Sequence, residues 1–266
     1  MNKIEILEPI TRVAADDLPP LEVAWIWGLP LARLDYAGVL HRVEALIARR
    51  RPGYFITANL QYAMLCDRDP TLAEINARAE FLLADGMPMV WWSRFRGQPL
   101  PERVAGSDLI YLLSAQAAEK GHRVFFLGGA PGSAQAAAAE LARRYPGLQL
   151  AGIEAPEIDR LSPDEHLALI DRIRRSRADL LFAALGQPKG ERWLSENCHL
   201  MEVPVSVQVG ASFDFVAGRA ARAPRWMQRT GLEWLHRMLS SPRRLAPRYF
   251  RNAMFLLRVL CRRGKA

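Results

Sequence analysis

The stretch FLLADGMPMVWW, residues 81–92, joins a short apolar run to a turn and then to a second apolar pattern. The run at 81–83 predicts a buried strand, Gly86 frees the turn, and Pro88 suits the first turn of a helix. An acid at such a strand end faces the crevice where open α/β sheets bind ligands. Asp85 is therefore predicted to be either the N-cap of the following helix or a catalytic acid.

The same alternation of strand and helix continues in both directions. Residues 21–35 predict a short hairpin, and further strands are predicted at 53–59, 148–153, 178–185, 203–209 and at the start of RVFFLGGAPGS, residues 123–133. Helical patterns separate most of them. Strands that alternate with helices of about 10–15 residues favour a mostly parallel sheet covered on both faces. The sequence therefore predicts a Rossmann-like α/β fold.

The net charge of +8 is concentrated at the C-terminal end of the 266-residue chain. Residues 219–266 hold 13 Lys+Arg and one acid, Glu233, whereas residues 1–218 hold 23 Lys+Arg and 27 acids. Residues 245–261 combine arginines with an apolar stripe, as in a basic amphipathic helix on a membrane surface. The alternative is a helix packed on the core with a solvated basic face. The stripe consists of Tyr249, Phe250, Met254, Phe255, Leu257 and Val259.

Several features favour a cytoplasmic protein without a transmembrane helix. Cys66, Cys198 and Cys261 form no CxxC pair, which indicates a reducing compartment and no structural zinc. The first twenty residues lack the basic start and apolar core of a signal peptide. No run of 18 apolar residues occurs. The basic end then predicts an anionic partner, either lipid head groups, a phosphorylated ligand or nucleic acid.

Two turns that contain glycine follow predicted strands. The backbone amides of Gly128 and Gly129, with the helix after them, could hold a phosphate, although a tight turn is the favoured explanation. GQPKGE at 186–191 occupies the equivalent place after another strand, and Lys189 there could meet a phosphate. Neither turn is a GxGxxG or P-loop motif. Together they favour a nucleotide ligand.

No metal or cofactor is predicted. Asp67-Arg68-Asp69 matches the DxD pattern of metal-binding sugar-nucleotide enzymes, but no strand precedes it to aim both carboxylates at one ion. We interpret it as a helix end with a cap for the next helix. The five histidines show no metal-ligand spacing, and no GxSxG elbow is present.

Several segments in this order resemble the WecG/TagA/CpsF family of glycosyltransferases, over roughly residues 25–250. The resemblance implies inverting, metal-independent transfer of a sugar from a UDP-sugar to a polyprenyl-diphosphate-linked sugar, in exopolysaccharide or cell-surface glycan synthesis. The segments are TANLQYAMLCDRDP at 57–70, ADGMPMVW at 84–91, RVAGSD at 103–108, FLGGAPG at 126–132, LGQPKGE at 185–191 and residues 209–249.

The resemblance also implies roles for individual residues. Asp85 would be the general base, Thr57 and Asn59 would line the acceptor and catalytic pocket, and Arg103 would meet the donor diphosphate. This chemistry fits the residues, because inverting transfer needs a carboxylate to take the acceptor proton and cations or amide dipoles to stabilise the departing UDP. The other expected substrate-binding residues are Gly128, Gly129, Gln187, Lys189, Glu191, Arg237, Arg244 and Arg248.

The three arginines Arg237, Arg244 and Arg248 match a C-terminal appendage that is expected to complete the site at the membrane. We accordingly divide the chain into a polar lead-in at 1–20, an α/β catalytic domain at 21–210 and a basic membrane-docking appendage at 211–266. The expected partners are the donor, the lipid-linked acceptor and the anionic inner face of the cell membrane, with no nucleic acid. A homo-oligomer is left open.

One departure from the family pattern bears on the donor. The family usually has Gln where this chain has Gly190, and the missing amide favours a hexose donor without an acetamido group. We therefore expect UDP-glucose, as in a xanthan-type GumM-like β-1,4-glucosyltransferase. The alternative within the family is UDP-N-acetylmannosamine or its uronic acid. From other classes, a nucleic-acid-binding protein with a basic C-terminal arm and a nucleotide-dependent dehydrogenase are kept as alternatives.

Overall fold

The computed structural model describes residues 20–224, 226–227, 230–240 and 242–262, without the side chains of Arg244, Leu260 and Arg262. Of the lead-in predicted at 1–20, all but the last residue lies outside this part of the chain.

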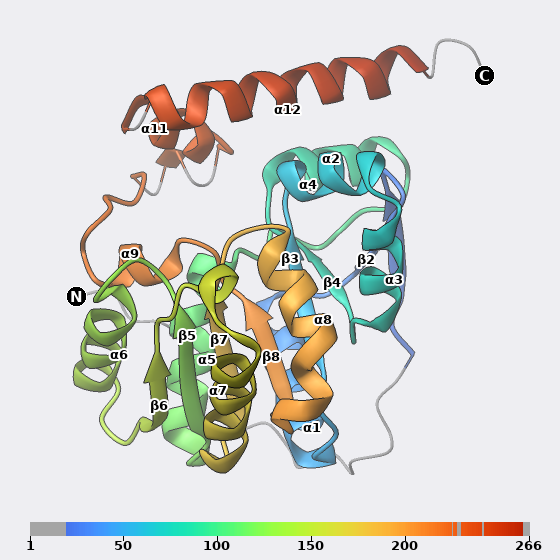
Figure 1. The fold of residues 1–266 in the computed structure, drawn as a ribbon. Coiled ribbons are helices and arrows are strands. Elements are labelled where there is room, and N and C mark those ends of the chain that lie inside the picture. Colours follow the sequence, from blue (N-terminus) through green and yellow to red (C-terminus); the bar gives the residue numbers. More distant parts are fainter. Residues whose placement is uncertain (1–19, 225, 228–229, 241, 263–266) are drawn as a thin grey trace.

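Eight strands form one sheet in the order β1-β2-β4-β3-β8-β7-β5-β6 (Figure 1). Neighbouring strands are parallel throughout, except in the predicted hairpin of β1 and β2. The Rossmann-like, mostly parallel sheet is thereby confirmed. The strands are β1 (Val23–Ile26), β2 (Leu29–Ala32), β3 (Tyr54–Ala58), β4 (Leu82–Ala84), β5 (Arg123–Gly128), β6 (Gln149–Glu154), β7 (Leu180–Ala184) and β8 (Val205–Gln208).

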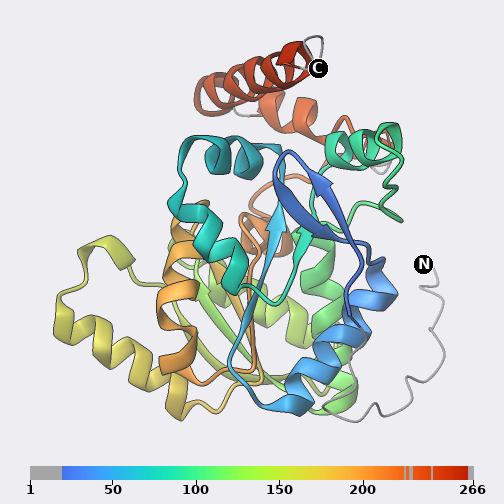
Figure 2. The same cartoon turned by 90° about the vertical axis from the view of Figure 1, so that its right-hand side faces the viewer.

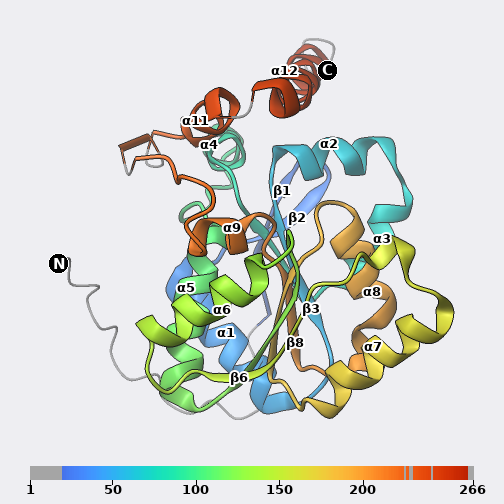
Figure 3. The ribbon, with the colours of Figure 1, turned by 60° about the vertical axis from the view of Figure 1, so that its left-hand side comes forward.

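Helices cover both faces of the sheet. Figure 3 shows α1, α5 and α6 on one face and α3, α7 and α8 on the other. The helices are α1 (Tyr36–Arg49), α2 (Leu60–Arg68), α3 (Thr71–Arg78), α4 (Met87–Phe95), α5 (Gly106–Lys120), α6 (Ser133–Arg144), α7 (Pro163–Arg175), α8 (Lys189–Met201), α9 (Ser212–Val216), α11 (Glu233–Ser240) and α12 (Pro242–Arg262), with a 3-10 turn η1 (Ile158–Arg160).

The two apolar cores follow from the alternation of side chains along the strands. In β3, Phe55 faces the core under α1, α5 and α6, and stacks on Phe81 with ring centroids 4.7 Å apart. Tyr54 and Ile56 face the opposite core, under α3, α7 and α8. All five β3 residues are buried, as expected for a central parallel strand.

The sheet order creates a switch point between β3 and β8. From β3 the chain moves outward to β4, whereas β8 reaches the other side of β3 after β5, β6 and β7 have formed the rest of the sheet. Ligands of open α/β sheets bind outside the carboxyl ends of strands at such a point. This places the ends of β3, β4, β7 and β8 at the predicted crevice.

The C-terminal helices lie across this carboxyl edge, above α2 and α4 (Figures 1 and 2). α9 belongs to the body rather than to these helices, because Phe213 is buried with its ring centroid 5.5 Å from that of Phe126. No helix among the described residues is both long enough and apolar enough to span a membrane.

α12 has two apolar faces, where the sequence pattern suggested a single stripe. Phe255 is buried and Val259 partly buried against the body, with the Phe255 ring centroid 5.9 Å from that of Trp27. Phe250, Met254 and Leu257 are exposed at 68%, 50% and 54%. The helix is therefore packed on the core on one side and presents an amphipathic surface on another.

Candidate functional site

Asp85 follows the last residue of β4. Its backbone N–H donates to the carbonyl of Ala58 at 2.8 Å, so Asp85 lies beside the end of β3, where Asn59 follows. The N-cap of α4 is Gly86, and no side chain caps that helix. The carboxylate instead lies 3.5 Å from the N–H of Gly106, the first residue of α5. The N-cap interpretation of Asp85 is therefore wrong, and its carboxyl group is available for another role.

The surroundings of Asp85 favour the neutral acid. Burial raises its pKa to about 7, Arg103 opposes the rise, Glu233 adds to it, and Arg237 opposes it. A general base is most effective when its pKa lies near the working pH. The group can thus accept a proton at neutral pH.

Arg103 is held by two acids. Its Nη1 lies 2.8 Å from Oε2 of Glu233 in α11, and its Nη2 lies 3.6 Å from Oδ2 of Asp108 in α5. The side chains of Arg103 and Glu233 are only 14% and 13% exposed. This ion pair connects α11 to the body beside Asp85. We made no site prediction for Glu233, although it is the only acid among the last 48 residues, which was the one signal that could have singled it out.

Arg237 comes to the same place from α11. Its guanidinium carbon lies 5.1 Å from the centre of the Phe215 ring, and its charge acts on Asp85. Arg248 lies in α12, where its charge and that of Arg237 oppose the burial that raises the pKa of Tyr249. The side chain of Arg244 lies outside the described residues. The structure thus brings Asp85, Arg103 and Arg237 together.

A second group of predicted residues forms a hydrogen-bonded network at the switch point. Asn59 caps α2 through its Oδ1, and its Nδ2 donates to Oε1 of Gln187 at 2.9 Å. Gln187 Nε2 donates to Glu191 Oε1 at 2.9 Å and to the Thr57 carbonyl at 3.2 Å. Thr57 Oγ1 donates to the carbonyl of Gln208 at 3.1 Å. The network joins the ends of β3, β7 and β8 to the start of α8.

Gly106 connects this network to Asp85. A Cβ atom at Gly106 would lie 3.3 Å from Thr57 Oγ1, while the Gly106 N–H faces Asp85. Helix α5 begins at this glycine, and no side chain caps it. Close approach of the backbone explains the glycine.

Glu191 is fully buried in the network. Burial raises its pKa to about 7, and the hydrogen bond from Gln187 opposes the rise. Its Oε2 has no hydrogen-bond partner among the described residues. A buried carboxyl group of this kind orients Gln187 rather than meeting solvent.

The space beside Gly190 of α8 is filled by a side chain from β8. A Cβ atom at Gly190 would lie 2.2 Å from Nε2 and 2.6 Å from Cδ of Gln208, a side chain that is 1% exposed at the end of β8. The Gln208 amide therefore fills the space that a side chain at 190 would enter. Nothing in the sequence indicates that position 208 lies against position 190.

The turn at Gly128 and Gly129 and the side chain of Lys189 take no part in the network around Gln187. Gly128 and Gly129 both have φ of +88°, and a Cβ at Gly128 would lie 2.6 Å from Leu185 Cδ2. At the start of α6, Ser133 Oγ donates to Asp214 Oδ1 at 2.5 Å. Lys189 Nζ pairs with the exposed Asp159 of η1 at 2.7 Å. These contacts account for the glycines as a tight turn, and a phosphate role for them stays a prediction.

Both carboxylates of the DxD sequence are engaged. Asp67 pairs with Arg258 of α12, and Asp69 pairs with Arg192 of α8. Asp69 also accepts hydrogen bonds from the N–H and Oγ1 of Thr71 at 3.1 and 2.7 Å, at the start of α3. In the part of the chain that the structure describes, no three His, Cys, Asp or Glu side chains converge as a metal site would require.

Comparison with known proteins assigns the chain to a family. A model of the Glycosyl transferase WecG/TagA/CpsF family matches residues 24–266. The chain is 32% identical over 221 residues to an N-acetylglucosaminyldiphosphoundecaprenol N-acetyl-beta-D-mannosaminyltransferase of Bacillus spizizenii strain W23, covering 81% of this chain and 84% of the relative. It is 31% identical to the Bacillus subtilis strain 168 protein of the same name, covering 84% and 85%. The chain therefore belongs to the WecG/TagA/CpsF family of glycosyltransferases.

Proposed function

We propose that this enzyme transfers an N-acetylmannosamine-type sugar from a UDP-sugar to N-acetylglucosamine on a polyprenyl diphosphate, with inversion and with Asp85 as general base. The observation that carries the proposal is Asp85 itself, a carboxyl group of pKa about 7 at a strand end, beside Arg103 and Arg237. The names of the relatives supply the acceptor and the transferred sugar.

The proposed step balances as a single displacement. The acceptor hydroxyl oxygen attacks the anomeric carbon, its proton passes to the Asp85 carboxylate, and the bond to the UDP oxygen breaks with its electron pair left on the diphosphate. Fixed cations stabilise that charge. Arg237 forms no ion pair among the described residues, whereas Arg103 is paired with Glu233, so Arg237 is the better candidate to face the diphosphate.

Gln208 bears on which donor the enzyme prefers. UDP-glucose was expected because Gly190 lacks an amide, but the buried Gln208 amide fills that space. The reason to prefer a hexose without an acetamido group is therefore weakened, and the relatives favour an N-acetylmannosamine-type donor. UDP-glucose remains the second candidate, because position 190 itself still lacks a side-chain amide.

A donor and acceptor screen tests this proposal. Purified enzyme is incubated with a panel of UDP-sugars and one of two detergent-dispersed acceptors, polyprenyl-diphosphate-N-acetylglucosamine or polyprenyl-diphosphate-glucose. Each reaction is run with and without EDTA, and the mass of the lipid product is measured by mass spectrometry. We expect the acceptor to gain one N-acetylhexosamine, both with and without EDTA. A hexose product would support the second candidate, and no product with any pair would reject the proposal.

The pH dependence follows from the direction of the Asp85 shift. The base must be deprotonated, so kcat/KM for the acceptor should rise with pH and level off above about pH 7. An Asp at its ordinary pKa would give a flat profile between pH 5 and 8. Initial rates in a constant-ionic-strength buffer series measure the profile.

We also propose that α11 and α12 dock on the anionic inner face of the membrane and form an appendage that begins after α9. Phe250, Met254 and Leu257 give α12 an exposed apolar surface, and the exposed Arg243 and Arg251 lie on the same helix. This combination is typical of helices that bind at a bilayer interface. Each cation near an anionic leaflet contributes about 1 kcal/mol.

Glutamate in place of Met254 and Leu257 together should reduce binding to anionic vesicles by at least about tenfold, because burying those side chains drives insertion. Both are exposed, so folding should be unaffected. The matched control is Leu167→Glu, which changes a 60% exposed leucine on α7. Sedimentation with vesicles measures binding, and equal binding of all three proteins would refute docking through this face.

A further inference from the structure

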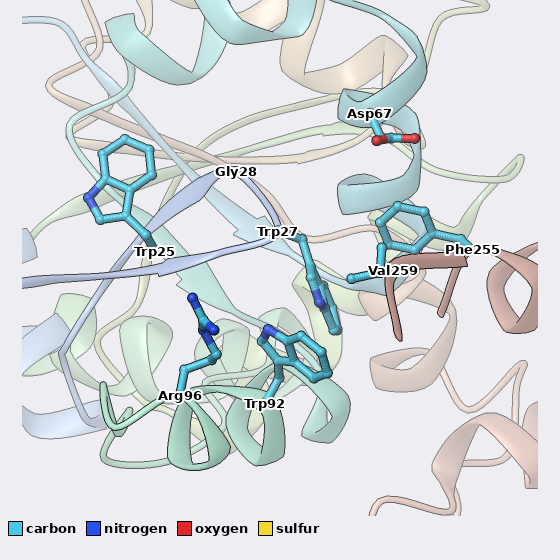
Figure 4. Close-up of a pocket in the computed structure, with 8 residues that line it drawn as sticks. All are labelled: Trp25, Trp27, Gly28, Asp67, Trp92, Arg96, Phe255 and Val259. Carbon is cyan, nitrogen blue, oxygen red and sulfur yellow. The ribbon is translucent and has the colours of Figure 1, made fainter. Parts of the chain in front are cut away.

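A cavity of about 370 Å³ lies between the β1–β2 hairpin, α4 and α12 (Figure 4). Trp25 and Trp27 of the hairpin region, Trp92 and Arg96 at the end of α4, and Phe255 and Val259 of α12 line it. The helix that belongs to the proposed membrane appendage thus forms one wall, and the catalytic body forms the others.

Aromatic rings extend from solvent into this cavity. The ring centroids of Phe95 and Trp92 are 5.8 Å apart, those of Trp92 and Trp27 are 5.8 Å apart, and those of Trp27 and Phe255 are 5.9 Å apart. Phe95 is 76% exposed and Phe255 is 3% exposed. Trp25 at the rim is 59% exposed. Such a row offers apolar contact along an extended ligand.

The charged groups of the lining point to an anion at the mouth. Asp67 of α2 also lines the cavity, and its charge is neutralised by an ion pair with Arg258. Arg96 is exposed, and it forms no ion pair within the described part of the chain. An aromatic cavity with one uncompensated cation at its entrance matches a molecule with an apolar tail and an anionic head.

The cavity lies along α4 from the reaction centre. Asp85 precedes the first residue of α4 by two positions, whereas Trp92 and Arg96 lie on one face at the other end. A helix of nine residues is about 13 Å long. An acceptor that extends along α4 from Asp85 would bring its diphosphate toward Arg96 and its first isoprenoid units to the aromatic rings.

We infer that this cavity binds the isoprenoid chain of the lipid-linked acceptor, and that Arg96 contacts its diphosphate. The inference rests on the proposed lipid acceptor and adds the subsite that recognises its lipid part. It also gives α12 a second task, since the cavity is complete only when Phe255 and Val259 close it.

Equilibrium binding of farnesyl diphosphate, measured without donor or sugar acceptor, tests the inference independently of transfer. Farnesyl diphosphate should bind at least about tenfold more tightly than inorganic diphosphate, because apolar surface is buried. Arg96→Ala should weaken its binding about tenfold through loss of a charged contact. Arg94→Ala is the matched control, because Arg94 is an exposed arginine on the same helix and does not line the cavity.

A third variant separates the apolar part from the charge. Trp25→Ala should weaken farnesyl diphosphate about tenfold and leave inorganic diphosphate unchanged, because only ring contacts are lost. Equal binding of the two diphosphates, or equal effects of Arg96→Ala and Arg94→Ala, would overturn the inference. Farnesyl diphosphate binding as predicted in an enzyme that transfers to no lipid acceptor would support the cavity and reject the proposed function. Transfer to polyprenyl acceptors by an enzyme that does not bind farnesyl diphosphate in this way would support the proposed function and reject the role of the cavity.

Discussion

Asp85→Asn should lower kcat by about 10²–10⁴-fold, because the amide cannot take the acceptor proton. The substitution preserves shape, and the Asn oxygen can still face the Gly106 N–H that lies 3.5 Å from the carboxylate. Folding and UDP binding should therefore be retained. Residual transfer should also lose its dependence on pH around 7.

Single-turnover rates, thermal unfolding and UDP titration on the same preparation measure these three properties. Asp164→Asn is the control, since Asp164 is an exposed acid in the first turn of α7. An Asp85→Asn enzyme that transfers at close to the wild-type rate would remove Asp85 as the base. Loss of UDP binding together with the fold would instead show a structural role.

Arg237→Ala should lower kcat by about 10²-fold, comparable to removing one group that stabilises developing charge. The guanidinium lies over the Phe215 ring beside Asp85, so the cation is fixed before the reaction begins. Arg237→Lys should recover part of the loss, because a positive charge returns without the planar contact to the ring.

The matched control is Arg243→Ala, which removes an exposed arginine of α12. Detergent-dispersed acceptor is used for all three proteins, so membrane affinity does not enter the comparison. If Arg237→Ala and Arg243→Ala had equal rates, the arginine of α11 would serve docking alone.

Much of the fold could be predicted because its signals are local. The apolar run before Asp85, the hairpin before α1 and the strand of residues 54–58 each appear within a few residues. The sequence predicted Thr57, Asn59 and Asp85 at strand ends, and the family resemblance implied that they share a pocket. The structure adds that β3 and β4 are neighbours.

The other parts of the site depend on contacts between distant segments. Arg103 and Glu233 are 130 residues apart in the sequence, and only the position of α11 makes them partners. Gln208 fills the space beside Gly190 because β8 ends next to α8. The stripe of α12 could not be divided into a packed and an exposed face until Trp27 was placed against Phe255.

Asp85 acts as the base in the proposed reaction, and Glu233 and Arg237 of α11 adjust its pKa. The pH dependence of kcat/KM tests both roles in wild type, Glu233→Gln and Arg237→Gln. Glu233 raises the pKa of Asp85 and Arg237 lowers it. The wild-type midpoint should lie near pH 7, that of Glu233→Gln should lie lower, and that of Arg237→Gln should lie higher. The same midpoint in all three enzymes, or no midpoint in this range, would contradict the account.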